Sequence, residues 1–177
     1  DDDLISVRLT DGSKQVILGT HDGMAIRFDE QQIRAMGRNA AGVKGIKLRE
    51  GDYVVGMEVV EPDQEVLVVT ENGYGKRTSE SEYRIQSRGG VGLKTIHVTE
   101  KNGKMVALKT VDGLEDVMLM TINGMIIRMD IDDISVIGRS TQGVRLIRLA
   151  DDERVSSVAK VLKDDSPEYD EIEQTEA

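Results

Sequence analysis

One short motif recurs three times in this chain at nearly constant spacing, and this periodicity limits the possible folds more than any other feature. Its clearest copy runs from Gln86 to Ile96. Aligning Arg88 with Arg38 and Arg139 brings a glycine four residues later into register each time. The steps between these arginines are 50 and 51 residues. The three copies, called the marker segments below, are residues 36–48, 86–98 and 137–149.

A second landmark has the same period. Gly23, Gly73 and Gly124 each end a Thr-x-x-Gly sequence, and each lies 19 residues before the glycine of the following marker segment. Two landmarks in constant phase predict a tandem array of supersecondary units. The Asp-Gly or Asn-Gly pair at each landmark, between two strand-like runs, predicts a tight hairpin turn with positive φ angles.

Short runs with apolar alternation predict four strands in each repeat. The predicted opening strands are 4–9, 53–60 and 105–111. The second strands are 15–20, 65–70 and 116–121, and the returning strands are 24–28, 74–78 and 125–129. A last strand follows each marker glycine, as at 43–48. An apolar anchor is expected ten residues after each turn glycine, at Ile33, Tyr83 and Ile134.

Four strands per repeat of about 50 residues, with no convincing amphipathic helix, predict an all-β array of propeller-like blades. We expect one domain over residues 4–163, with repeats at about 4–50, 51–101 and 102–152. An extra strand at 155–161 is expected to complete a neighbouring blade by exchange. Residues 164–177, rich in acids and poor in apolar residues, are predicted to form a disordered tail.

The net charge of −10 is unevenly distributed. Residues 164–177 hold seven acids and neither lysine nor arginine, and residues 1–3 are all aspartate. The rest of the chain is therefore balanced, and the positions of its cations matter more than their sum. The absence of cysteine, of a long apolar run and of a signal peptide predicts a cytoplasmic protein that does not enter a membrane.

Basic residues occupy the same four positions in every repeat, with His97 as the one exception. Equivalent residues of equivalent blades share a face, so we expect a basic band that contacts the phosphates of duplex DNA. The alternative is that these are ordinary solvated cations copied by descent. The expected DNA contacts are Arg27, Arg77 and Arg128; Arg38, Arg88 and Arg139; Lys44, Lys94 and Arg145; and Lys47 and Arg148.

At these residues the chain resembles the C-terminal domain of the bacterial DNA gyrase A protein. The resemblance covers residues 4–163 and is carried by segments such as 70–78, 42–46 and 142–149. It implies a β-pinwheel, a disc of blades that exchange strands and whose rim wraps DNA. It also implies a nucleoid-associated parent enzyme of two A and two B subunits, which uses ATP and Mg²⁺ to introduce negative supercoils.

The signature of that family is the gyrase A box, Q-R-R-G-G-K-G. Here Gln86, Ser87, Arg88, Gly89, Gly90, Val91 and Gly92 match five of its seven positions. We interpret this stretch as a degenerate copy from a later blade, and we expect the true box to lie upstream, in a first blade outside this chain. Two alternatives stay open: the corresponding C-terminal domain of topoisomerase IV, which binds DNA without strong wrapping, and a propeller that binds proteins.

No catalytic, metal or cofactor site is expected in this part of the protein. Tyr53, Tyr74 and Tyr83 lie at repeat positions typical of packing residues, and the acids near Asp130 are typical of a solvated loop. His21 and His97 have no partner at metal-ligand spacing. The acidic tail could compete with DNA for the basic band, or it could only increase solubility.

Overall fold

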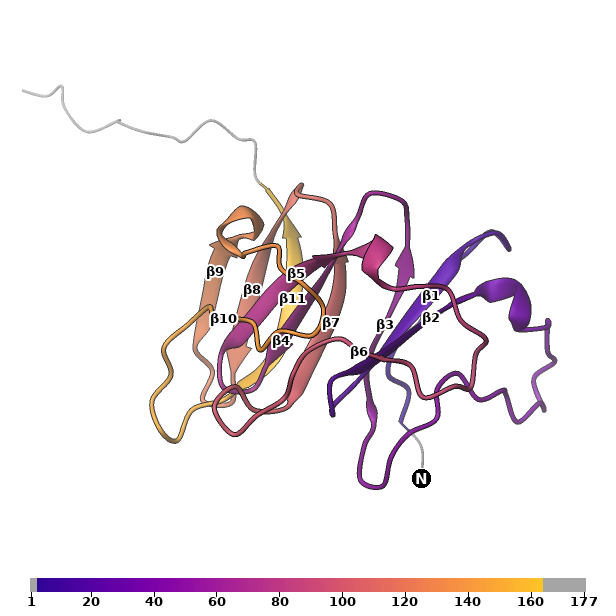
Figure 1. The fold of residues 1–177 in the computed structure, drawn as a ribbon, viewed down its shortest axis with the longest axis horizontal. Coiled ribbons are helices and arrows are strands. Elements are labelled where there is room, and N and C mark those ends of the chain that lie inside the picture. Colours follow the sequence, from indigo (N-terminus) through magenta and orange to yellow (C-terminus); the bar gives the residue numbers. More distant parts are fainter. Residues whose placement is uncertain (1–2, 164–177) are drawn as a thin grey trace, which may run out of the picture.

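The computed structural model describes residues 3–163 and consists of short β-strands and three one-turn 3₁₀ helices (Figure 1). The strands are β1 (Gln15–Thr20), β2 (Met24–Asp29), β3 (Val54–Val60), β4 (Glu65–Thr70), β5 (Tyr74–Ser79), β6 (Leu93–Lys94), β7 (Met105–Val111), β8 (Glu115–Thr121), β9 (Ile126–Asp130), β10 (Val144–Arg145) and β11 (Val155–Leu162). The helices are η1 (Glu30–Gln32), η2 (Glu80–Glu82) and η3 (Ile131–Asp133). The all-β class is confirmed. None of the helices in residues 3–163 has the length and apolarity needed to span a bilayer.

The strands form three antiparallel sheets side by side, each built around one tight hairpin (Figure 1). Their orders are β3-β1-β2-β6, β10-β5-β4-β7 and β11-β8-β9. In the first two sheets the central hairpin comes from one repeat and both flanking strands come from the next repeat. The extra strand expected at 155–161 is present as β11, which pairs with β8. Strand exchange therefore ties each repeat to its neighbour.

Two predicted strands do not form where the sequence placed them. Residues 4–9 have no strand pairing, and Leu4 and Leu9 are 84% and 98% exposed. Their counterparts β3 and β7 each pair with the hairpin of the preceding repeat, and the described residues contain no such hairpin for residues 4–9. Similarly, 43–48 stays unpaired, whereas the strands after the second and third marker glycines are only two residues long and pair with the preceding repeat.

The predicted hairpin turns are present, but only their glycines have positive φ. The φ angles are +78° at Gly23, +76° at Gly73 and +86° at Gly124, whereas the residue before each glycine has negative φ. The glycine N–H donates to the carbonyl of the threonine three residues earlier, at 2.9 Å in the first repeat. The loops therefore have three residues and close with a glycine in the left-handed region.

The apolar core lies between adjacent sheets. Tyr83 packs with residues of the first two sheets, among them Ile17 and Leu108, and Ile134 packs with residues of the second and third, among them Leu67 and Leu119. These two anchors are 1% and 0% exposed, as predicted, but the equivalent Ile33 is 38% exposed. The difference follows from the exchange, because an anchor is buried against the preceding repeat.

Candidate nucleic-acid interface

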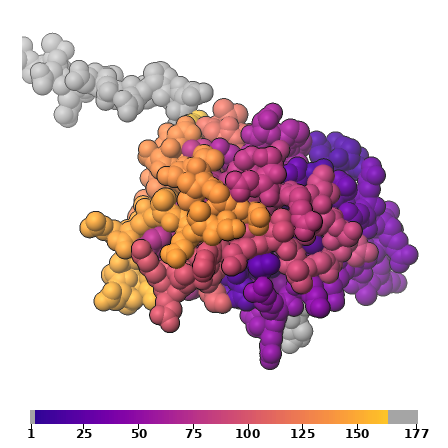
Figure 2. Space-filling view, in the orientation of Figure 1, coloured from indigo at the N-terminus to yellow at the C-terminus, as the bar shows by residue number. Residues whose placement is uncertain are grey.

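Strand exchange places each marker segment against the preceding one. Gly89 donates its N–H to the carbonyl of Gly45, and Lys47 donates its N–H to the carbonyl of Gly90 at 2.8 Å. His97 donates in the same way to Thr141 at 2.9 Å. Figure 2 shows the second and third marker segments, pink and orange, lying together on one face. The three marker segments thus form one continuous surface.

The marker glycines are required by this close approach. At Gly143, φ is +77° and an added Cβ would lie 2.8 Å from the carbonyl oxygen of Gly75 in β5. Gly92 lies in the same way against the carbonyl of Ala25 in β2. Gly42 has a similar φ of +78° but no atom within 4 Å of the Cβ position. The recurring glycine therefore serves strand exchange in the second and third repeats.

Arg88 and Arg139 hold the marker segments together. Arg88 donates from Nη1 to the carbonyl of Lys44 at 3.0 Å, and Arg139 donates from Nη1 to the carbonyl of Lys94 at 2.6 Å. Arg88 also donates from Nε to the carbonyl of Gln32. Both arginines are half-buried. They were expected to contact DNA, but several of their donors bind the protein itself.

The arginines of the returning strands form cross-strand pairs inside the hairpins. Arg27 donates to Gln15 Oε1 at 2.7 Å and Arg77 to Glu65 at 2.8 Å, while Arg128 pairs with Asp116. In each case the partner is twelve residues earlier.

Two of these arginines also reach the following repeat. Arg27 donates to the carbonyl of Glu80 and Arg77 to that of Ile134, both at 2.8 Å. Their side chains are 12% and 11% exposed, against 48% for Arg128. This geometry favours a structural role for Arg27 and Arg77 over phosphate contact.

The other predicted positions present exposed cations. Within residues 3–163 none of these side chains forms a salt bridge, so their charges are available to a ligand. They are Arg38, Lys44, Lys47, Lys94, Arg145 and Arg148.

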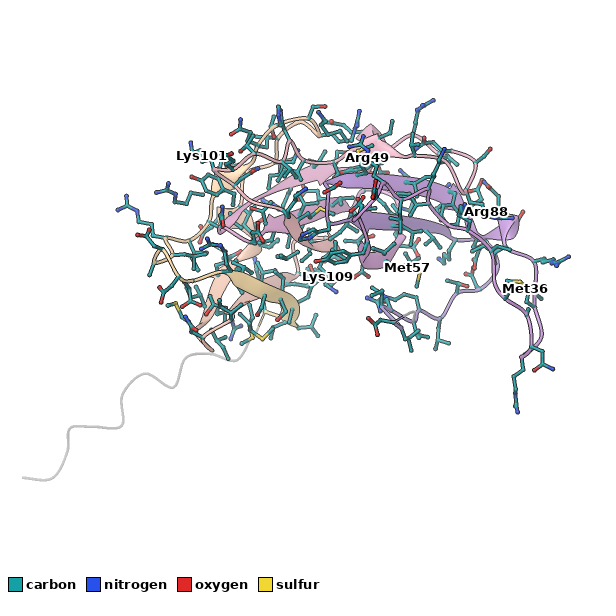
Figure 3. The ribbon with its side chains drawn as sticks, turned by 90° about the horizontal axis from the view of Figure 1, so that it is seen from below. Met36, Arg49, Met57, Arg88, Lys101 and Lys109 are labelled. Carbon is teal, nitrogen blue, oxygen red and sulfur yellow. The ribbon has the colours of Figure 1, made fainter. Side chains whose placement is uncertain are left out.

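Sequence reasoning also missed a further set of cations that lie near the marker segments in the sequence. A stronger signal than periodicity would have found them, because residues 31–49, 83–99 and 134–150 contain no aspartate or glutamate. Figure 3 places Arg49, the last residue of the first stretch, and Lys101, which follows the second, along one edge of the array, with Lys109 away from that edge. The missed cations in or just after the acid-free stretches are Arg34, Arg49, Arg84, Lys101 and Arg154.

Lys76 supports this surface from below. It lies in β5 at 0% exposure, and its ammonium donates to the carbonyls of Gly138 and Arg139 at 2.6 and 2.5 Å. The equivalent residues in the other repeats are Ile26 and Ile127. Burial lowers the pKa of Lys76 to about 8; the charge of Arg139 also lowers it, and that of Glu82 opposes the shift. This lysine therefore joins the second sheet to the third marker segment.

The other residues considered as possible sites, Asp130 and Tyr53, contact neighbouring side chains of the protein. Asp130 forms a salt bridge with Lys163 at 2.8 Å, and residues 3–163 hold no group of three or more potential ligands placed to bind a metal. Tyr53 is 52% exposed and packs by stacking on His21, with ring centroids 4.5 Å apart. The acidic tail at 164–177 lies outside the described residues.

Comparison with known proteins agrees with this architecture. The family model described as DNA gyrase C-terminal domain, beta-propeller, matches residues 14–61, 64–112 and 115–161. Each matched range holds a central hairpin and the strand after it. Each matched range therefore corresponds to the hairpin of one sheet and the exchanged strand that pairs with it.

Relatives and solved structures point to the same family. The DNA gyrase A protein of Staphylococcus aureus (strain NCTC 8325 / PS 47) is 55% identical over 177 residues, which are 99% of this chain and 20% of that protein. The crystal structure of the C-terminal domain of DNA topoisomerase IV has a TM-score of 0.84 at 30% identity, over 89% of this chain and 49% of that one. A DNA gyrase A C-terminal domain has a TM-score of 0.78 at 29% identity, over 85% and 51%. The chain therefore belongs to the family of DNA gyrase C-terminal domains.

Proposed function

We propose that this domain binds duplex DNA along its three marker segments and bends it around the array. The observation that carries this proposal is the charge of the continuous surface formed by the marker segments. Its exposed cations, such as Lys44, Lys94 and Arg148, form no salt bridge within residues 3–163, and each lies in a stretch of sequence without aspartate or glutamate. Such cations bind regularly spaced phosphates with little regard to base sequence.

Within a gyrase A protein, this binding would serve the whole enzyme. In a complex of two A and two B subunits, DNA wrapped on this domain would set the handedness of the DNA crossing. ATP-driven strand passage would then introduce negative supercoils. The chain spans 20% of the gyrase A relative, and our proposal assigns the sites for ATP, Mg²⁺ and DNA cleavage to other parts of the enzyme. The domain itself contributes binding and bending.

The second candidate function is binding without strong bending, as in the topoisomerase IV type. The TM-score of 0.84 with that C-terminal domain favours it on shape alone. The 55% identity to the gyrase A protein favours the first candidate. The two functions differ in the path of the bound DNA, and the path can be measured.

The test is a titration of the 177-residue chain with a duplex of ~40 base pairs, labelled with a donor and an acceptor dye at its two ends, across a salt series. Affinity that falls steeply with salt, together with approach of the ends, is the expected result. Tight binding without approach of the two DNA ends would favour the second candidate, binding of the topoisomerase IV type. Absence of binding even at ~50 mM salt would overturn DNA binding by this domain.

A further inference from the structure

The second sheet contains an arginine that is oriented by a tyrosine. Arg145 of β10 lies directly opposite Tyr74 of β5 in the strand register. Its Nε and Nη2 donate to the Tyr74 hydroxyl at 3.2 and 2.9 Å, and its guanidinium carbon lies 5.4 Å from the ring centroid. Tyr74 is only 7% exposed, so the hydroxyl is held in place. Since an arginine has five N–H donors, three stay directed to solvent or to a ligand.

A second cation approaches the same ring from a loop. The ammonium of Lys101 lies 5.7 Å from the Tyr74 ring centroid, within the range of a cation–π contact. Lys101 and Arg145 both line a groove of about 360 Å³, which Arg148 and Arg154 also line. Figure 3 shows Lys101 on the edge of the array that also carries Arg49.

Two carboxylates also line the groove. Glu153 is 6% exposed and accepts hydrogen bonds from the backbone N–H and the side-chain amide of Asn123, so its charge is already engaged. Asp151 is exposed at the end of the groove. Four cations against these two acids leave the groove positive, and its volume exceeds what one phosphate group needs.

The equivalent place in the first sheet lacks this arrangement. There Met24 of β2 stands opposite Lys94 of β6, and Arg49 contacts the Met24 sulfur at 3.9 Å. A thioether is a weak acceptor and cannot fix a cation as the Tyr74 hydroxyl does. An oriented guanidinium loses less freedom when it binds an anion.

We propose that the groove around Tyr74 is the strongest phosphate-binding subsite of the surface. In it, Arg145 and Lys101 contact one phosphate of duplex DNA, and Tyr74 is the positioning residue for Arg145. This proposal rests on the DNA binding proposed above and names the place where one phosphate is bound most strongly. Lys101 becomes a DNA contact that the repeat pattern did not predict.

The test compares Tyr74→Phe, Lys101→Gln and Lys109→Gln in the 177-residue chain, with the salt dependence of duplex affinity as the readout. Tyr74→Phe keeps every charge but removes both hydrogen bonds that orient Arg145, so we expect roughly fivefold weaker binding with an unchanged salt slope. Lys101→Gln should lower the slope by about one. Lys109→Gln removes a cation that pairs with Glu58 and does not line the groove, and it should change neither quantity.

A purely structural role for Tyr74 would change thermal stability and not affinity. Thermal unfolding of each variant is therefore measured in parallel. If Tyr74→Phe does not fold, Tyr74→Met copies the Met24 arrangement of the first sheet and should give the same loss of affinity. If Lys101→Gln matches Lys109→Gln and Tyr74→Phe matches the parent chain, while Lys94→Gln still weakens binding, the subsite proposal fails and the DNA-binding proposal stands.

If the parent chain binds no duplex, both proposals fail for DNA, and inorganic pyrophosphate then shows whether the groove binds phosphate at all. The readout is the ¹H–¹⁵N resonance of Arg145 Nε. A shift that Tyr74→Phe abolishes would reassign the groove to a small phosphate ligand and overturn its role in nucleic-acid binding. An unchanged resonance would remove the groove as a phosphate site.

Discussion

The guanidinium of Arg88 donates a hydrogen bond to the backbone carbonyl of Lys44, 3.0 Å away and 44 residues earlier in the chain. Arg139 makes the same bond to Lys94. Each marker segment is thus completed by the next repeat, which supplies the bond that fixes the backbone beneath an exposed lysine. The hydrogen bonds that stabilise the array therefore also position its exposed lysines.

The marker glycines allow this link to be tested. In Gly92→Ala, the alanine would have to adopt a positive φ, and its Cβ would also overlap the carbonyl of Ala25. Gly42→Ala requires the same φ but has no atom within 4 Å of the new carbon. We expect Gly42→Ala to cost about 1 kcal/mol of unfolding free energy and Gly92→Ala about 3 kcal/mol. Urea unfolding of the two variants measures the difference, and equal costs would show that exchange does not require the glycine.

The hairpin arginines predict a different contrast. Arg77→Met leaves Glu65 and the carbonyl of Ile134 without their donor in a nearly buried site. We expect a loss of about 2 to 3 kcal/mol of unfolding free energy. Arg128→Met removes an exposed pair with Asp116 and should cost less than about 1 kcal/mol. Equal losses, measured by chemical denaturation, would contradict the structural role assigned to Arg77.

The sequence was sufficient to predict the period, the hairpins, the all-β class and two of the three buried anchors, because these depend on local patterns. Apart from the exchanged strand expected at 155–161, it did not predict which repeat contributes each strand. Alternation makes residues 4–9 look like 53–60, but a strand forms only where a preceding hairpin supplies its hydrogen bonds. That information depends on contacts about 50 residues apart, which periodicity cannot show.

The candidate site was predicted by the same reasoning with the same limitation. Repetition identified Lys44, Lys94 and Arg145 together with Arg27 and Arg77, since copied positions look alike in sequence. Burial separates them, because Arg77 has carbonyl and carboxylate partners across a repeat boundary, whereas Lys94 has no ion pair within residues 3–163. Lys101 was missed because the equivalent positions in the other repeats, Gly51 and Asp152, are not basic. The acid-free stretches would have been a better guide, since they reflect surface potential.

The phosphate contacts predict a split between affinity and stability. Lys44→Gln should lower the salt slope of duplex binding by about one and leave the thermal midpoint unchanged, since its charged group is exposed. Arg27→Gln should lower the midpoint by a few degrees, about 2 to 4 °C per kcal/mol for a domain of this size, and leave the slope unchanged. Fluorescence anisotropy across a salt series, with calorimetry on the same samples, gives both quantities. The reverse pattern would return Arg27 to the set of DNA contacts.

Lys76 makes the stability of the array depend on pH. Its pKa in the folded protein is lowered to about 8 from an ordinary value of 10.5, chiefly by burial. Between these two values the unfolded chain binds more protons than the folded one, so the unfolding free energy rises with pH across this window. The full effect of this group is at most about 3 kcal/mol. Below pH 8 the cost of burying the charged ammonium is fully present.

Lys76→Met, which gives β5 an apolar residue like Ile26 and Ile127, should remove this contribution. Urea unfolding is measured at pH 7.5, 8.5 and 9.5, about one pH unit apart, from just below the folded-state pKa into the window between the two pKa values. The rise in unfolding free energy with pH should be smaller for the variant than for the parent chain. Lys109→Met, which removes a lysine paired with Glu58, should keep the parent's rise. The difference between the two variants therefore reports the buried ammonium at position 76 and not the loss of any lysine. If the variant and the parent rise equally, Lys76 carries no buried charge, and another contact must fix the third marker segment.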